Sequence, residues 1–183
     1  LDPTMTSPYA FFQFFLNSDD RDVEQLLRSF SFKSHDELEA LFDSLKTNPG
    51  AREAHRALAR EVTTLIHGET QTNKVENAAK ALFGQSEIRD LDIDTLESAL
   101  SELPRTTIGK GAEMPTWVDL ITAAGVVDSK SAARRVVKEG GAYINNEKIA
   151  GEDFAPTVDH LLHGRFIVLR KGKRDLAAVE VVS

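Results

Sequence analysis

The chain has 183 residues, 41% of them apolar, no cysteine and a formal net charge of −7 at neutral pH. This composition excludes a wholly disordered chain, because the apolar fraction is enough for one or two hydrophobic cores. It also excludes disulfides and thiolate zinc sites, which fits a cytoplasmic protein. No apolar run approaches the roughly 20 residues of a membrane-spanning helix, so we expect no membrane partner.

The net charge is unevenly distributed. Residues 1–111 contain 12 Lys and Arg against 19 Asp and Glu, whereas residues 112–183 contain 10 of each. Within the second part, residues 165–174 (RFIVLRKGKR) carry five basic residues and no acidic one. Local fields, more than the average charge, decide what such a chain binds.

The first residues, LDPTMTSPYAFFQFF, have neither the basic region nor the small-residue cleavage site of a signal peptide. Because the sequence does not begin with methionine, we expect it to be a piece of a longer protein.

The first predicted helix follows directly. Ser7 and Pro8 are typical of a helix start, and Asn17 is typical of a helix end. Apolar residues surround most of this helix, so we expect it to be largely buried. They are Tyr9, Phe11, Phe12, Phe14, Phe15 and Leu16.

Residues 1–104 as a whole predict a helical bundle. Amphipathic segments with short connections follow one another, and such a series favours a compact bundle. Ser34 and Glu37 form a capping-box pattern, Pro49-Gly50 interrupts the series, and Gly68 ends the longest helix. The further predicted helices are residues 19–30, 34–45, 51–67, 74–83 and 94–102.

The pattern changes after Pro104. Residues 105–115 contain glycines and a proline without helical periodicity, so we predict a linker there. Residues 116–183 predict a small α+β domain, and the fold class is a helical bundle followed by this domain. Its predicted elements are two helices at 117–125 and 129–141, a hairpin of strands 142–144 and 147–149 around Asn145-Asn146, and a second hairpin of strands 165–170 and 177–182.

The segment SAARRVVKEGGAYINNEKI (131–149) predicts an anion-binding surface. Ser129 or Ser131 can cap the helix, whose first amides are then free for an anion. Arg134 and Lys138 share a helix face, and Gly140-Gly141 permits a close approach of another backbone. The alternative is a solvated helix face with an ordinary glycine C-cap.

The segment AGVVDSKSAARRVVKEGGAYINNEKI resembles the S-four-type RNA-binding module, which is named after a small-subunit ribosomal protein. The matching positions run in the order of the family pattern: Ala124, Gly125, Ser129, Ser131, Ala133, Arg134, Arg135, Gly140, Gly141 and Asn145. The resemblance implies binding of structured RNA through its shape and phosphates. The expected RNA-binding residues are Ser129, Lys130, Ser131, Arg134, Arg135, Lys138, Gly140, Gly141, Asn145, Lys148, Arg170, Lys171, Lys173 and Arg174.

The helical half of the chain indicates which family with such a module this sequence resembles. SPYAFFQFFLNSDDRDVEQLLRSFSFKSHDELEAL and LAREVTTLIHGE (58–69) resemble the anticodon-binding region of bacterial tyrosyl-tRNA synthetases, and the similarity covers essentially all 183 residues in the family's order. The HIGH-type and KMSKS-type motifs of that family's catalytic half do not occur here. The resemblance therefore implies a tRNA-binding part without its own catalytic residues, whose ATP, tyrosine and magnesium sites lie in the missing half.

Asp19 and Asp20 follow the aromatic helix, where the resemblance places anticodon contacts. Carboxylates accept hydrogen bonds from base amino and imino groups, so we expect these residues to contact the anticodon. The alternative is that they are first-turn acids favoured by the helix dipole. For the Phe cluster and for Trp117, a place in a core is favoured over stacking on a base.

We therefore expect a partner, tRNA-Tyr, bound at its anticodon region and long variable arm. The resemblance implies a parent enzyme that dimerises through the missing half and a monomeric fragment. One alternative is an S-four-type module of an RNA-modifying or ribosome-associated protein, and another is a helical protein-interaction domain. No metal site is expected, because the histidines show no ligand-like spacing with acids: His35, His55, His67, His160 and His163.

Overall fold

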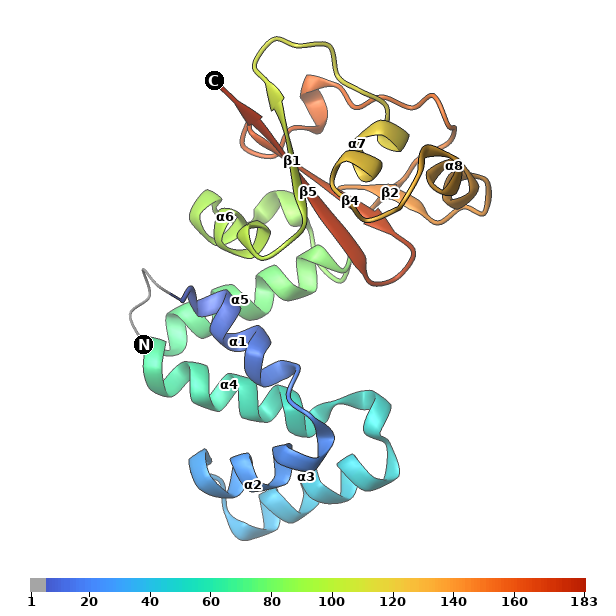
Figure 1. The fold of residues 1–183 in the computed structure, drawn as a ribbon. Coiled ribbons are helices and arrows are strands. Elements are labelled where there is room, and N and C mark those ends of the chain that lie inside the picture. The colour runs from blue at the N-terminus through green and yellow to red at the C-terminus, as the bar shows by residue number, and fades with distance from the viewer. Residues whose placement is uncertain (1–5) are drawn as a thin grey trace. The chain divides into compact units, whose positions relative to one another are not determined.

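The computed structural model describes residues 6–183, which divide into two compact units. The first ends at Glu76 and the second begins at Asn77, so helix α5 (Glu69–Leu82) contributes to both (Figure 1). No helix within this described range is long and apolar enough to cross a membrane.

Four complete helices, one short 3₁₀ turn and the first part of α5 build the described part of the first unit. The Oγ of Ser7 accepts a hydrogen bond from Ala10 N at 3.1 Å, and Ser34 and Glu37 complete the predicted capping box. The elements are α1 (Pro8–Leu16), α2 (Asp20–Phe30), α3 (His35–Thr47), η1 (Pro49–Ala51) and α4 (Glu53–His67).

Helix α4 lies at the centre of this unit, where it contacts α1, α2 and α3. Its apolar positions pack against apolar residues of the other three helices. The buried members of this core are Phe11, Val23, Leu27, Phe42, Ala54, Leu58 and Val62.

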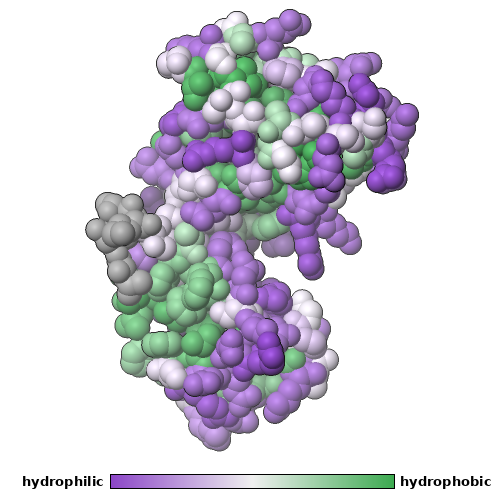
Figure 2. All heavy atoms as spheres, in the orientation of Figure 1, coloured by the Kyte–Doolittle hydropathy of each residue, from purple (hydrophilic) through white to green (hydrophobic). Residues whose placement is uncertain are grey.

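Helix α1 was predicted to be largely buried, and the expectation of a core position is wrong at Phe14. Phe11 and Phe12 are buried, but the side chain of Phe14 is 71% exposed. Helix α1 packs on α4 along one side only, so an apolar residue on its other side faces solvent. Leu65 and Ile66 at the end of α4 are also exposed, and Figure 2 shows apolar surface over α1 and the end of α4.

Helix α5 begins at Glu69, five residues before its predicted start. Gly68, with φ of 82°, ends α4, and the chain turns directly into the next helix. Thr72 Oγ1 donates to Gly68 O at 3.0 Å and lies 3.1 Å from Thr64 Oγ1. The polar sequence of this first turn carries no apolar periodicity, so its helical state depends on these contacts.

A five-stranded sheet forms the framework of the second unit. The strand order is β1-β5-β4-β2-β3, with β1 parallel to β5 and the other neighbours antiparallel. The elements are η2 (Ile88–Asp90), α6 (Ile93–Ser101), β1 (Arg105–Gly109), α7 (Trp117–Ala123), α8 (Lys130–Lys138), β2 (Ala142–Ile144), β3 (Glu147–Lys148), η3 (Val158–His160), β4 (Phe166–Lys171) and β5 (Asp175–Val182).

The linker predicted at residues 105–115 is wrong in its first half, because residues 105–109 form the edge strand β1. Ala178 N donates to Pro104 O at 2.9 Å at the start of this pairing. Its partner strand β5 lies about 70 positions later in the chain. A five-residue strand that pairs only with so distant a segment carries no local signal of its own.

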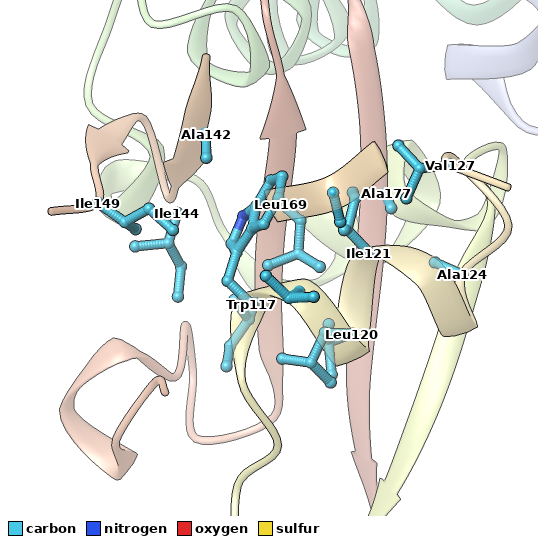
Figure 3. Close-up of a cluster of buried hydrophobic side chains, with 14 of the residues drawn as sticks. Trp117, Leu120, Ile121, Ala124, Val127, Ala142, Ile144, Ile149, Leu169 and Ala177 are labelled. Carbon is cyan, nitrogen blue, oxygen red and sulfur yellow. The ribbon is translucent and has the colours of Figure 1, made fainter. Parts of the chain in front are cut away.

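Helices α7 and α8 cover one face of the sheet. Trp117 is completely buried there, and its Nε1 donates to Tyr143 O at 3.0 Å, which confirms it as a core residue (Figure 3). Other buried members of this core are Leu120, Ile121, Ala133, Val137, Ala142, Ile144, Ile167, Leu169, Ala177 and Val179.

Residues 77–103 contact the rest of the second unit away from α7 and α8, through an ion pair and a hydrogen bond. Arg165 stacks over Phe166 at 4.6 Å and forms an ion pair of 2.9 Å with Glu97 of α6. Asn146 Nδ2 donates to Ala81 O at 2.6 Å. The predicted domain boundary at 104 therefore differs from the observed division after Glu76. Helical periodicity alone could not show which neighbour these helices pack against.

The Asn-Asn turn predicted between β2 and β3 is confirmed, with φ of 46° at Asn145 and 71° at Asn146. The side chain of Asn145 is buried. Its Nδ2 donates to His160 O at 2.6 Å, and its Oδ1 accepts from Val168 N at 2.9 Å. One amide thus joins the hairpin to β4 and to η3.

We predict that Asn145→Ala lowers the free energy of unfolding by roughly 2–4 kcal/mol, because it leaves the buried N–H of Val168 and the half-buried C=O of His160 without partners. Urea unfolding followed by circular dichroism measures this change. Glu147→Ala on the same hairpin is the control, since Glu147 is exposed and should change stability little. Equal stability of the two variants would contradict the bridging role of Asn145.

His55 is fully buried in the first unit. Burial lowers the pKa of its imidazole, Arg52 adds to the effect and Asp20 opposes it. The unfolded chain therefore takes up a proton near the ordinary pKa of about 6.5 while the folded protein resists protonation.

We predict that the free energy of unfolding falls as the pH drops below about 6.5, by at most about 1.4 kcal/mol per pH unit from this residue. Denaturant unfolding between pH 8 and pH 5 measures the slope, which should be shallower in His55→Gln. His35→Gln removes an exposed imidazole and is the control. The same slope in all three proteins would exclude His55 as its origin.

Candidate nucleic-acid interface

Helix α8 carries the basic residues that the sequence singled out. Ser129, and not Ser131, is its N-cap: the Oγ of Ser129 accepts from Ala132 N at 3.2 Å. Ser131 is exposed in the first turn. Arg134, Arg135 and Lys138 are all exposed along the helix, with side-chain exposures of 50%, 76% and 72%. The structure therefore presents these cations to solvent on one short helix.

Each of these cations has an acidic neighbour. Glu152 bridges two of them: its Oε2 lies 3.6 Å from Arg134 Nε and its Oε1 lies 3.1 Å from Lys138 Nζ. Arg135 and Glu139 form a looser pair of 3.9 Å on the helix itself.

Lys130 is held in the same way at the start of α8. Its Nζ contacts Asp119 Oδ1 at 2.6 Å, and this contact, with that of Thr116, lowers the pKa of the Asp119 carboxyl. Glu152 and Asp119 lie far from their partners in sequence, so no local pattern pointed to them. The positive face of α8 is thus partly neutralised from within the unit.

The double glycine after α8 brings three segments together. Gly140 has φ of 72°, and Gly141 N donates to Val136 O at 2.9 Å, as in a left-handed helix end. A Cβ at Gly140 would lie 2.5 Å from Lys148 Nζ, so the Lys148 side chain runs directly over this glycine. Gly172 N donates to Gly141 O at 2.7 Å. The close approach predicted for the glycines therefore occurs within the protein.

The basic cluster at 170–174 divides into bound and free side chains. Arg170 stacks over the Tyr143 ring at 4.0 Å and donates to Gly172 O at 3.0 Å. Lys171 pairs with Asp175 at 2.8 Å. Lys173 and Arg174 are exposed at the turn, and within residues 6–183 neither forms an ion pair. Among the predicted RNA-binding residues that the structure describes, Lys148, Lys173 and Arg174 are therefore basic side chains outside any ion pair.

The side chain of Asn145, a predicted RNA contact, is bonded within the protein. Both polar atoms of its side chain are bonded within the protein, to Val168 N and His160 O. The amide is buried, and these two bonds shape the hairpin that carries Lys148.

The two acids of the first unit lie at the N-terminus of α2 in different settings. Asp19 is the N-cap, and Arg21 binds both of its oxygens at 3.0 Å, which lowers the pKa of Asp19 to about 2. Asp20 is 57% exposed, and its Oδ1 lies 3.0 Å from Nε2 of the buried His55. Asp20 is therefore the more accessible acceptor, and no local sequence pattern indicated its histidine neighbour.

The arrangement suits binding of a polyanion. Exposed lysines and arginines on α8 and on two hairpin turns can each approach a phosphate without a large conformational change. In the part of the chain that the structure describes, no three His, Asp or Glu side chains are grouped so as to hold a metal ion.

Comparison with known proteins covers both units. Residues 95–179 match the family described as the tyrosine–tRNA ligase SYY-like C-terminal domain, and residues 1–84 match the class I tRNA synthetases (W and Y). The tyrosine–tRNA ligase of Streptomyces avermitilis is 58% identical over 181 residues, which cover 99% of this chain and 42% of that protein. That of Corynebacterium efficiens is 51% identical, covering 99% of this chain and 43% of that protein.

A solved structure is also similar: a C-terminally truncated mitochondrial tyrosyl-tRNA synthetase of Aspergillus nidulans. It is 34% identical, covers 45% of this chain and 24% of that chain, and has a TM-score of 0.43. The chain spans about two fifths of the length of the bacterial relatives. With 51–58% identity over nearly all of its residues, the chain belongs to the tyrosine–tRNA ligase family and corresponds to the C-terminal region of the bacterial members.

Proposed function

We propose that this chain is the tRNA-binding portion of a tyrosine–tRNA ligase, which orients tRNA-Tyr for aminoacylation by a part of the ligase outside this chain. The sequence identity over 99% of the chain supports the assignment. ATP, tyrosine and magnesium would bind that other part, through which the parent enzyme would dimerise. The chain by itself would be a cytoplasmic monomer.

The observation that carries the proposal is the exposed basic face of α8 together with the turn that follows it. Arg134, Arg135 and Lys138 point to solvent from one helix, and Lys148 extends from the hairpin to the helix end. In an S-four-type module, this surface would grip phosphates between the anticodon stem and the long variable arm. Shape recognition of this kind needs few base contacts.

The first unit would approach the anticodon. Asp20 is its best placed acceptor, because Asp19 is occupied by Arg21 on both oxygens. A carboxylate can accept two hydrogen bonds from the imino and amino groups of a guanine edge. Discrimination among anticodons would then depend on Asp20, while affinity would depend mainly on the second unit.

We predict that Arg134→Ala combined with Arg135→Ala weakens tRNA-Tyr binding and reduces the slope of log K against log salt by about one unit for each phosphate that the variant no longer neutralises. Filter binding at several salt concentrations measures both quantities. A change of charge elsewhere on the chain should not reproduce the effect.

The matched control removes two cations from the opposite edge of the sheet, Arg105→Ala with Lys110→Ala on and beside β1. It should leave the slope nearly unchanged. Unaltered affinity and slope in the α8 variant would show that this face does not bind the tRNA.

We predict that Asp20→Asn reduces the preference of the chain for tRNA-Tyr over a tRNA-Tyr with an altered anticodon, because the amide replaces one acceptor oxygen by a donor. Competition binding with the two tRNAs measures the ratio of affinities. Asp22→Asn, in the same first turn of α2 and also exposed, is the control. An unchanged ratio in Asp20→Asn would remove Asp20 from anticodon recognition.

A further inference from the structure

Glu152 occupies an unusual position for an acidic residue on a proposed RNA-binding face. It lies between β3 and β4 in a loop that is tied to the core, since Trp117 N donates to Phe154 O at 2.8 Å and Phe154 packs against the core residues. Phe154 N in turn donates to Gly151 O at 3.3 Å. The backbone on both sides of Glu152 is thus held in place, and its carboxylate is directed to α8.

The carboxylate has the charge and the two-oxygen geometry of a phosphodiester. Its Oε1 contacts Lys138 Nζ and its Oε2 contacts Arg134 Nε, so each oxygen serves one of two cations that are one helical turn apart. Two non-bridging oxygens of an RNA phosphate, also with one negative charge, would satisfy the same pair. The cations remain open to solvent, at 50% and 72% exposure, whereas Glu152 is 31% exposed.

We propose that Glu152 is a built-in competitor of RNA phosphate: it holds Arg134 and Lys138 in place in the free protein and is displaced when a backbone phosphate binds them. The inference rests on the proposed tRNA-binding role of α8 and adds a residue that limits its affinity. A nucleic acid that does not also contact Lys148 and the 170–174 turn gains too little binding free energy to displace the carboxylate. Glu152 therefore favours a correctly shaped RNA over any polyanion.

The test is Glu152→Gln in the same chain, with affinity for tRNA-Tyr and for an unrelated tRNA measured at low and high salt. An exposed ion pair contributes modestly, so we expect binding about two- to fivefold tighter at low salt, with a smaller gain at high salt. The increase in affinity should be at least as large for the unrelated tRNA as for tRNA-Tyr. Thermal unfolding checks that the variant is folded.

Glu139→Gln is the matched control, because it removes one negative charge from the same helix end but frees only the loosely paired Arg135. A second arm places Glu152→Gln in a Lys138→Ala background, where the gain should largely disappear. Equal gains in Glu152→Gln and Glu139→Gln, no gain, or a gain that survives Lys138→Ala would overturn the role of Glu152. Failure of the unmodified chain to bind tRNA-Tyr would instead overturn the proposed function itself.

Discussion

The burial of Trp117 is the constraint on which the rest of the second unit depends. Its indole N–H bonds to Tyr143 O and its backbone N–H bonds to Phe154 O, so one residue ties α7, strand β2 and the loop of Glu152 together. Helix α8 packs on the same core and takes its orientation from it. The placement of α8, which carries the basic side chains, is therefore a consequence of apolar packing around the core that Figure 3 shows.

An acidic chain can carry a local group of basic side chains because charge acts locally. The excess of acids lies in residues 1–111, and the cations of α8 are balanced by Glu152, Asp119 and Glu139 within a few ångströms. Under the proposed function, this internal balance would limit the attraction of polyanions in general. Specificity would then come from the number of phosphates that a ligand presents at once, since each displaced ion pair costs little by itself.

Part of this architecture was predictable from the sequence and part was not. Ser34 with Glu37, Gly140 and the Asn145-Asn146 turn are local signals, and each appears in the structure as predicted. Strand β1 was missed because its partner β5 lies far along the chain, and Phe14 was assigned to a core that covers only one side of α1. Asn145 matches the motif of an RNA contact, and only the structure shows that its side chain also supports the hairpin from within the protein.

The sequence by itself determined the helices, the turns, the identity of the basic residues and the family. These depend on capping, periodicity and residue order, which are all properties of residues close together in the sequence. Only the tertiary structure decided that Glu152 meets Arg134 and Lys138, that His55 lies against Asp20, and that residues 77–103 join the sheet. Contacts between distant segments depend on how whole elements pack, because burial of apolar faces selects among arrangements that local patterns leave equally open.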